Sequence, residues 1–64
     1  MDAAWDYLVE QVLLEVDPDE IARLHIRRRL HDSGELGEMF SLWKQGGQDE
    51  QVKRILTRLA EQWR

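Results

Sequence analysis

Cysteine is absent from this 64-residue chain, and this absence removes several classes of site at once. Without a thiol the chain has no disulfide, no thiolate zinc site and no cysteine nucleophile. A cysteine-free composition also suits a reducing compartment. The first residues, Met1-Asp2-Ala3-Ala4, lack the basic start of a secretory signal. The sequence therefore predicts a cytoplasmic protein.

Long apolar runs and strand-like alternation are missing as well. No stretch approaches the roughly 18 uninterrupted apolar residues of a membrane span, so we expect no membrane partner. No segment alternates between apolar and polar residues over the length of a strand. Proline occurs once and glycine four times, which leaves few positions where a helix must stop. These absences favour an all-α fold.

The length of the chain allows one domain and one hydrophobic core. A domain this small hides only about 60% of the surface that its unfolded chain exposes. Its stability then depends on tight helix packing or on a partner, because disulfides are excluded. We therefore predict a single helical domain over residues 1–64 that is stabilised by close packing or by oligomerisation.

Apolar residues recur at helical spacing in four segments. Short connections between helices favour antiparallel neighbours, so the segments predict a small bundle of four helices. The expected helices cover residues 2–16, 18–32, 35–45 and 48–63.

The predicted breaks carry familiar start and stop signals. Asp17 is a good N-cap, Pro18 suits the first helical position, and Glu20 completes a capping box. Gly34 can adopt the left-handed conformation that ends a helix, with Asp32 or Ser33 capping the next one. Gly46-Gly47 makes a second stop. Such signals are common to helices in general and indicate no particular family.

The main apolar stripe of each segment predicts the core. Its members share one helix face with neighbours three or four positions away. The predicted core residues are Trp5, Leu8, Val12, Ile26, Leu30, Leu36, Phe40, Trp43, Ile55, Leu59 and Trp63.

Several large apolar residues fall outside these stripes. Tyr7 and Leu14 lie opposite the main stripe of the first segment, and Leu42 lies beside that of the third. Ile21 and Leu24 lie off the seam of the second segment. Four short helices cannot easily cover all of them, and an exposed apolar patch is typical of an interface. Tyr7, Leu14, Ile21 and Leu24 are therefore the candidate protein interface.

Charge is distributed in blocks along the chain, although the formal net charge is only −4. Residues 1–20 hold seven acids and no base, whereas residues 21–31 hold four arginines and no acid. Neighbouring helices with opposite charge can pair directly. The simplest interpretation is that the acids of the first helix neutralise the arginines of the second.

No residue pattern predicts catalysis, a metal or a cofactor. His25 and His31 lie six positions apart, so on one helix they point about 120° away from each other. Ser33 suits a cap or turn, and no nucleophile motif surrounds Ser41. His31 and Glu35 have a spacing suited to metal ligands, but Gly34 interrupts the helix between them. We expect a protein that is not an enzyme.

Nucleic-acid binding is the main alternative. Arg23, Arg27 and Arg28 concentrate charge on one helix, and Arg54 and Arg58 form a second basic group. Two short helices joined at a glycine turn are compatible with a helix-turn-helix. Against this, the sequence pI is near 5.0, whereas nucleic-acid modules usually present an uncompensated basic face. The same arginines could also contact an acidic protein partner.

The favoured interpretation is a small regulatory module that acts by protein–protein interaction. It would dock onto a larger protein or form a homodimer through the candidate interface. A variant of this hypothesis is an inhibitor whose acidic first segment blocks a basic channel on an enzyme. The modest net charge of −4 argues against that variant.

Overall fold

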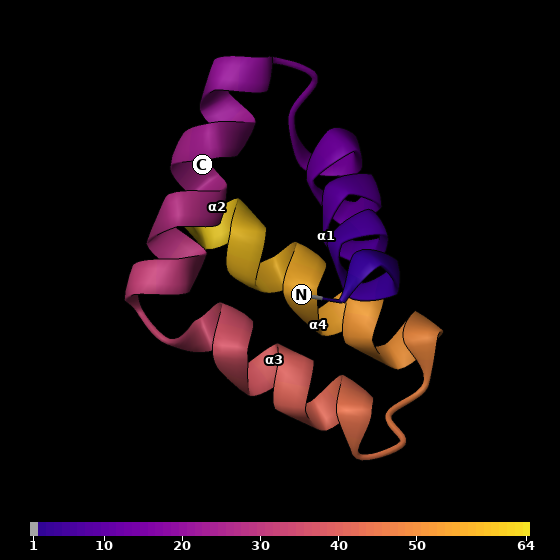
Figure 1. Ribbon diagram of the computed structural model, residues 1–64. Coiled ribbons are helices and arrows are strands. Elements are labelled where there is room, and N and C mark those ends of the chain that lie inside the picture. The colour runs from indigo at the N-terminus through magenta and orange to yellow at the C-terminus, as the bar shows by residue number, and fades with distance from the viewer. Residues whose placement is uncertain (1) are drawn as a thin grey trace.

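The computed structural model describes residues 2–64 and forms four helices: α1 (Ala3–Val16), α2 (Glu20–Asp32), α3 (Glu35–Lys44) and α4 (Asp49–Gln62). These residues contain no strand, so the predicted all-α bundle of four helices is confirmed. In Figure 1, α1 and α2 run in opposite directions, and α3 and α4 form a second antiparallel pair that crosses them. No helix among the described residues has the length and apolar character needed to cross a bilayer.

Helix α4 is the central element of the fold. It packs against each of the other three helices and passes behind the space between α1 and α3 in Figure 1. Val52, Leu56 and Ala60 on its inner face are completely shielded from solvent. This follows from its sequence, because its apolar residues keep to one stripe over the whole helix.

The predicted core is confirmed in part. Six of its members are buried: Trp5, Leu8, Val12, Ile26, Leu30 and Leu36. The other five are only partly buried and pack against the core from outside: Phe40, Trp43, Ile55, Leu59 and Trp63. Seven further residues, which lie on the same predicted apolar stripes, complete the buried set: Val9, Leu13, Val16, Met39, Val52, Leu56 and Ala60.

In two partly exposed tryptophans the indole N–H meets a hydrogen-bond acceptor, as is usual for this group. Trp43 Nε1 donates to Asp49 Oδ1 at 2.8 Å, and Trp63 Nε1 donates to Glu35 Oε1 at 2.7 Å. Trp5 instead packs inside, with its ring centroid 5.5 Å from that of Phe40 and 5.4 Å from that of Trp43. The polar edges of Trp43 and Trp63 thus hold these rings at the border of the core.

The start of α2 differs from the prediction. Asp19, and not Asp17, is the N-cap, and its carboxylate accepts a hydrogen bond from the Ile21 N–H at 3.3 Å. Asp17 Oδ1 accepts from the Asp19 N–H at 2.9 Å, so Asp17, Pro18 and Asp19 form a short linker outside both helices. The predicted start at Pro18 was wrong by two residues, because the linker makes its own hydrogen bond before the helix begins. The other ends agree within one residue.

The breaks around α3 agree with the glycine signals. Gly34 has φ +85° and Gly46 has φ +98°, both in the left-handed region that favours glycine. The Ser33 hydroxyl accepts from the Glu35 N–H at 3.3 Å and donates to the Leu30 carbonyl at 3.1 Å. Ser33 therefore joins the end of α2 to the start of α3.

Asp2 connects the start of α1 to the end of α3. Its carboxylate accepts a hydrogen bond from the Trp5 N–H at 3.1 Å and lies 3.6 Å from Lys44 Nζ. The Trp5 N–H first, and the Lys44 charge after it, lower the pKa of Asp2 below its ordinary value. Asp2 is thus a charged N-cap over the pH range in which most proteins work.

Candidate functional site

The exposed large apolar side chains are concentrated on two of the four helices. Tyr7 is 66% exposed and Leu14 51% exposed on α1, and Ile21 is 64% exposed and Leu24 60% exposed on α2. We call these four residues the α1–α2 surface. Among residues 2–64, Leu42 of α3 is the only other exposed large hydrophobic side chain, at 37%. All five large apolar residues that fall outside the predicted stripes are thus exposed.

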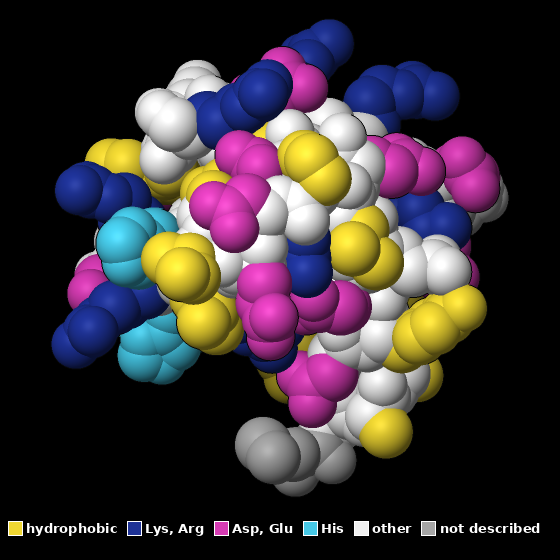
Figure 2. Space-filling model, turned by 90° about the horizontal axis from the view of Figure 1, so that it is seen from above, with side chains coloured by type: hydrophobic (Ala, Val, Ile, Leu, Met, Phe, Trp, Pro, Cys, Tyr) yellow, Lys and Arg dark blue, Asp and Glu magenta, His cyan; other side chains and the backbone are white. Residues whose placement is uncertain are grey.

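The exposed apolar groups are separated by charged side chains. In Figure 2, hydrophobic side chains occupy several small areas, and acidic side chains lie between them. Such a mosaic differs from the apolar core of an obligate interface, which is depleted of charge.

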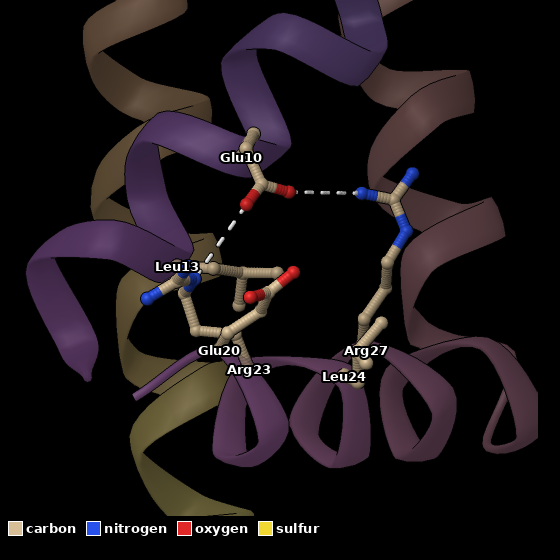
Figure 3. Close-up of a pocket in the computed structure, with 6 residues that line it drawn as sticks. All are labelled: Glu10, Leu13, Glu20, Arg23, Leu24 and Arg27. Atoms are coloured by element: carbon tan, nitrogen blue, oxygen red, sulfur yellow. Dashed lines mark ion pairs between the residues drawn. The ribbon is translucent and has the colours of Figure 1, made fainter. Parts of the chain in front are cut away.

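A groove between α1 and α2 contains two of the candidate arginines. It has a volume of about 210 Å³ and is lined by Glu10, Leu13, Glu20, Arg23, Leu24 and Arg27. In Figure 3, Glu10 reaches from α1 to both arginines: its carboxylate lies 3.5 Å from Arg23 Nε and 3.6 Å from Arg27 Nη1. Arg27 also donates to Asp6 at 3.2 Å. The predicted charge pairing between the first two helices is therefore present.

Arg23 is built into the fold rather than presented to solvent. Its side chain is only 14% exposed, and Nη1 donates to the carbonyls of Asp17 at 3.1 Å and Pro18 at 2.6 Å. These carbonyls belong to the linker where α1 has ended and α2 has not begun. Arg23 therefore satisfies backbone acceptors that no helix satisfies, and together with Arg27 it braces α1 against α2.

The remaining candidate arginines are all exposed. Arg28 is on α2, whereas Arg54 and Arg58 are on α4. Within residues 2–64 none of the three forms an ion pair. The structure thus divides the five predicted contact arginines into two that hold helices together and three that are exposed and form no ion pair within the described residues.

Four of the seven acids in residues 1–20 are paired with cations. Asp6 and Glu10 bind Arg27, Asp2 lies near Lys44, and Asp17 lies 3.9 Å from Arg64. Within the described residues, Glu15, Asp19 and Glu20 have no such pair. The acidic segment therefore presents much less free charge than its sequence suggests.

The histidines and serines are placed separately. His25 and His31 are both exposed on α2, and His31 Nδ1 lies 3.4 Å from Asp32 Oδ1. The Ser33 hydroxyl is occupied by local hydrogen bonds to Leu30 and Glu35. No group of three or more His, Asp or Glu side chains in the described part of the chain is arranged to hold a metal.

One feature near Tyr7 was missed by the sequence analysis. A groove of about 190 Å³ is lined by Ala4, Tyr7, Leu8, Gln11, Trp43, Asp49 and Lys53. Gln11 Nε2 donates to the Tyr7 hydroxyl at 2.8 Å, which holds the ring at the edge of the groove. No sequence signal could have identified this groove, because its walls come from α1, the end of α3 and the start of α4.

Comparison with known proteins adds no relative. No family model matches the chain, and neither a curated protein nor a solved structure matches it. The α1–α2 surface, the two grooves and the exposed arginines are therefore the features from which a function can be inferred.

Proposed function

We propose that this chain is a non-enzymatic regulatory module that binds another protein through the α1–α2 surface. One observation carries the proposal: four of the five exposed large apolar side chains lie on α1 and α2. Burying such side chains is the main driving force of protein association. We also propose a cytoplasmic location, which the lack of cysteine supports.

The position of the surface supports docking. Tyr7 and Leu14 are separated by seven residues on α1 and so share one face of that helix. The ion pairs of Glu10 with Arg23 and Arg27 hold α2 beside it. A surface that is already ordered loses less conformational entropy on binding. Inhibition of an enzyme by docking is one regulatory use of this surface, and Glu15, Asp19 and Glu20 are the acids of residues 1–20 that form no ion pair within the described residues.

Affinity capture of the tagged chain from its native lysate, after nuclease treatment, tests the proposal. We expect a defined protein partner, and we expect Tyr7→Ser combined with Leu14→Ser to reduce its recovery at least about tenfold. Leu42→Ser is the control, because it makes the same kind of change on α3, outside the surface. Circular dichroism checks that both variants remain helical. Recovery that is equal for the double variant and the wild type contradicts the proposal.

A second candidate function is nucleic-acid binding through Arg28, Arg54 and Arg58. The observation that favours it is that these exposed arginines form no ion pair within residues 2–64. Such binding should weaken steeply with salt, because each phosphate contact releases a counterion. Reversing Arg54 and Arg58 to Glu should then abolish it, and nuclease should remove the captured partners. Capture that survives nuclease favours the protein-docking function.

A further inference from the structure

The break between α2 and α3 departs least from helical geometry. Ser33, the last residue before the turn, has φ −76° and ψ −11° and so is right-handed helical. Gly34 alone turns the chain, with φ +85°, and α3 starts immediately after it. The other two breaks contain extended residues, with ψ 126° at Asp17 and ψ 141° at Gln48. A change of conformation at one residue would therefore join α2 and α3 into a continuous helix over residues 20–44.

Such a continuous helix would keep a single apolar face. At about 100° per residue, the buried side chains of both helices fall within one half of its circumference. These side chains are Ile26, Leu30, Leu36 and Met39. The start of α3 would also gain hydrogen bonds, because Gly34 has no side chain with which to cap it. The Leu36 and Gly37 N–H groups would then donate to the carbonyls four residues earlier.

The helices on each side of Gly34 form two separately braced pairs. The α1–α2 pair is held by Glu10, whose carboxylate lies 3.5 Å and 3.6 Å from two arginines of α2. In the α3–α4 pair, the Gly47 N–H donates to the Leu42 carbonyl at 3.0 Å, and a Cβ added at Gly47 would lie 2.7 Å from that oxygen. Figure 1 shows the two antiparallel pairs crossing one another. Gly34 is therefore the joint between two units.

We propose that Gly34 is a hinge at which two copies of this chain exchange their α3–α4 pairs. In each copy α2 and α3 straighten into the continuous helix, and the α3–α4 pair of one copy packs on the α1–α2 pair of the other. Such domain swapping restores each core with contacts that the chain already makes.

A second copy is the partner because only the faces of this chain are known to match. Trp5 of α1 packs on Phe40 of α3, with ring centroids 5.5 Å apart, and α1 also packs along α4. Straightening at Gly34 would uncover both sides of these contacts. The same pair from another copy covers them with identical residues, so the swapped dimer requires no additional surface.

The exchange should depend on concentration. The closed monomer and the swapped dimer share nearly the same core, so linkage of the two pairs in one chain favours the monomer in dilute solution. Opening uncovers side chains such as Val9 and Leu56, which are completely shielded, so interconversion should be slow. The α1–α2 surface lies wholly within one pair, and a swapped dimer presents it twice. Docking through this surface, as proposed above, requires only the monomer, so the exchange is an additional property.

Sedimentation velocity of Gly34→Ala is the first test, with each sample refolded from urea at its final concentration. A side chain disfavours the left-handed conformation of the closed monomer but suits the continuous helix. Both chains of the dimer escape this penalty, so we expect its dissociation constant to fall at least about thirtyfold relative to wild type. Wild type should be a monomer at micromolar concentration and form dimers at millimolar concentration.

Two other glycines provide matched controls. Gly46→Ala introduces the same backbone penalty, since Gly46 has φ +98° and an added Cβ would meet no atom within 4 Å. It lies within the α3–α4 pair, so it should destabilise the monomer without favouring the dimer. Gly37 is inside α3 in both states, so Gly37→Ala should leave the dissociation constant unchanged. A dimer that Gly46→Ala favours equally contradicts the hinge.

Isotope-filtered nuclear Overhauser measurements identify the exchanged contacts. Labelled and unlabelled Gly34→Ala chains are refolded together at a concentration where dimers form. Contact between Trp5 and Phe40 should then appear between chains. Contact between Trp43 and Asp49, whose side chains hydrogen-bond within the α3–α4 pair, should remain within one chain.

Two results would overturn the hinge. One is a helical Gly34→Ala chain that stays monomeric at millimolar concentration, and the other is a dimer in which Trp5 and Phe40 are in contact only within one chain. If Gly34→Ala does not fold at any concentration, wild type refolded at millimolar concentration is measured in the same way. The lack of a contact between chains there contradicts the hinge as well.

Discussion

Arg23 and Arg58 have the same side chain in opposite surroundings. Arg23 donates to the carbonyls of Asp17 and Pro18 and lies against Glu10, whereas Arg58 is exposed and unpaired within the described residues. We expect Arg23→Ala to lower the free energy of unfolding by about 1–3 kcal/mol, because two linker carbonyls lose their donor.

Arg58→Ala is the matched control and should change stability by no more than about 0.5 kcal/mol. Urea unfolding followed by circular dichroism measures both variants. Equal effects would mean that Arg23 does not brace the linker. If Arg23→Ala also weakens partner capture, the loss of stability has to be separated from the loss of a contact before Arg23 is assigned to a binding surface.

At this scale the sequence could predict that charges pair but not which residues do so. The acidic and basic blocks indicated attraction between the first two helices. Glu10 and Asp6 of α1 provide it through their ion pairs with arginines of α2. Whether an arginine points toward α1 or toward solvent depends on how α2 is rotated about its axis. That rotation is set by burial of Ile26 and Leu30, which the sequence predicted, but the side of α2 on which α1 lies became known only with the fold.

Two glycines of the α3 region offer a test of the helix start. Gly34 precedes α3 with φ +85°, and Gly37 lies inside α3 with ordinary helical geometry. An added Cβ would meet no atom within 4 Å at either position, so only backbone conformation separates them. Gly34→Ala should lower the free energy of unfolding by about 1–2 kcal/mol, because a side chain disfavours the left-handed region.

Gly37→Ala should have the opposite sign and raise stability by about 0.5–1 kcal/mol, since alanine has the higher helix propensity. Thermal and urea unfolding of the two variants give the comparison. Stabilisation by Gly34→Ala would show that the chain does not need a left-handed residue between α2 and α3. That result would favour one continuous helix across the break.

The sequence predicted the number, order and approximate ends of the elements because their signals are local. The glycine stops at Gly34 and Gly46 can be recognised from residues close in the sequence, and so can the apolar stripes. The start of α2 was wrong because Asp17 and Asp19 are both good caps, and their choice depends on the linker hydrogen bond between them. The groove beside Tyr7 was missed because three helices form it.

At the scale of the whole molecule, stability depends on one small core. A single core in a chain of this size rarely supplies more than about 3–5 kcal/mol. Leu56 lies at its centre on α4, completely shielded from solvent, and α4 contacts all three other helices. A substitution at this position therefore affects the packing of the entire domain.

We expect Leu56→Ala to cost about 2–5 kcal/mol, because it removes buried methyl groups and leaves a cavity. That cost equals or exceeds the available stability, so the variant should be mostly unfolded, with low helicity and no cooperative urea transition. Leu42→Ala, at a partly exposed position, should keep a cooperative transition. Both are compared at a low concentration where the chain is monomeric, because self-association would add stability by mass action. If Leu56→Ala recovers wild-type helicity and a cooperative transition only at high concentration, contacts between copies carry part of the stability. If its urea transition is cooperative at every concentration, α4 is not the centre of the fold.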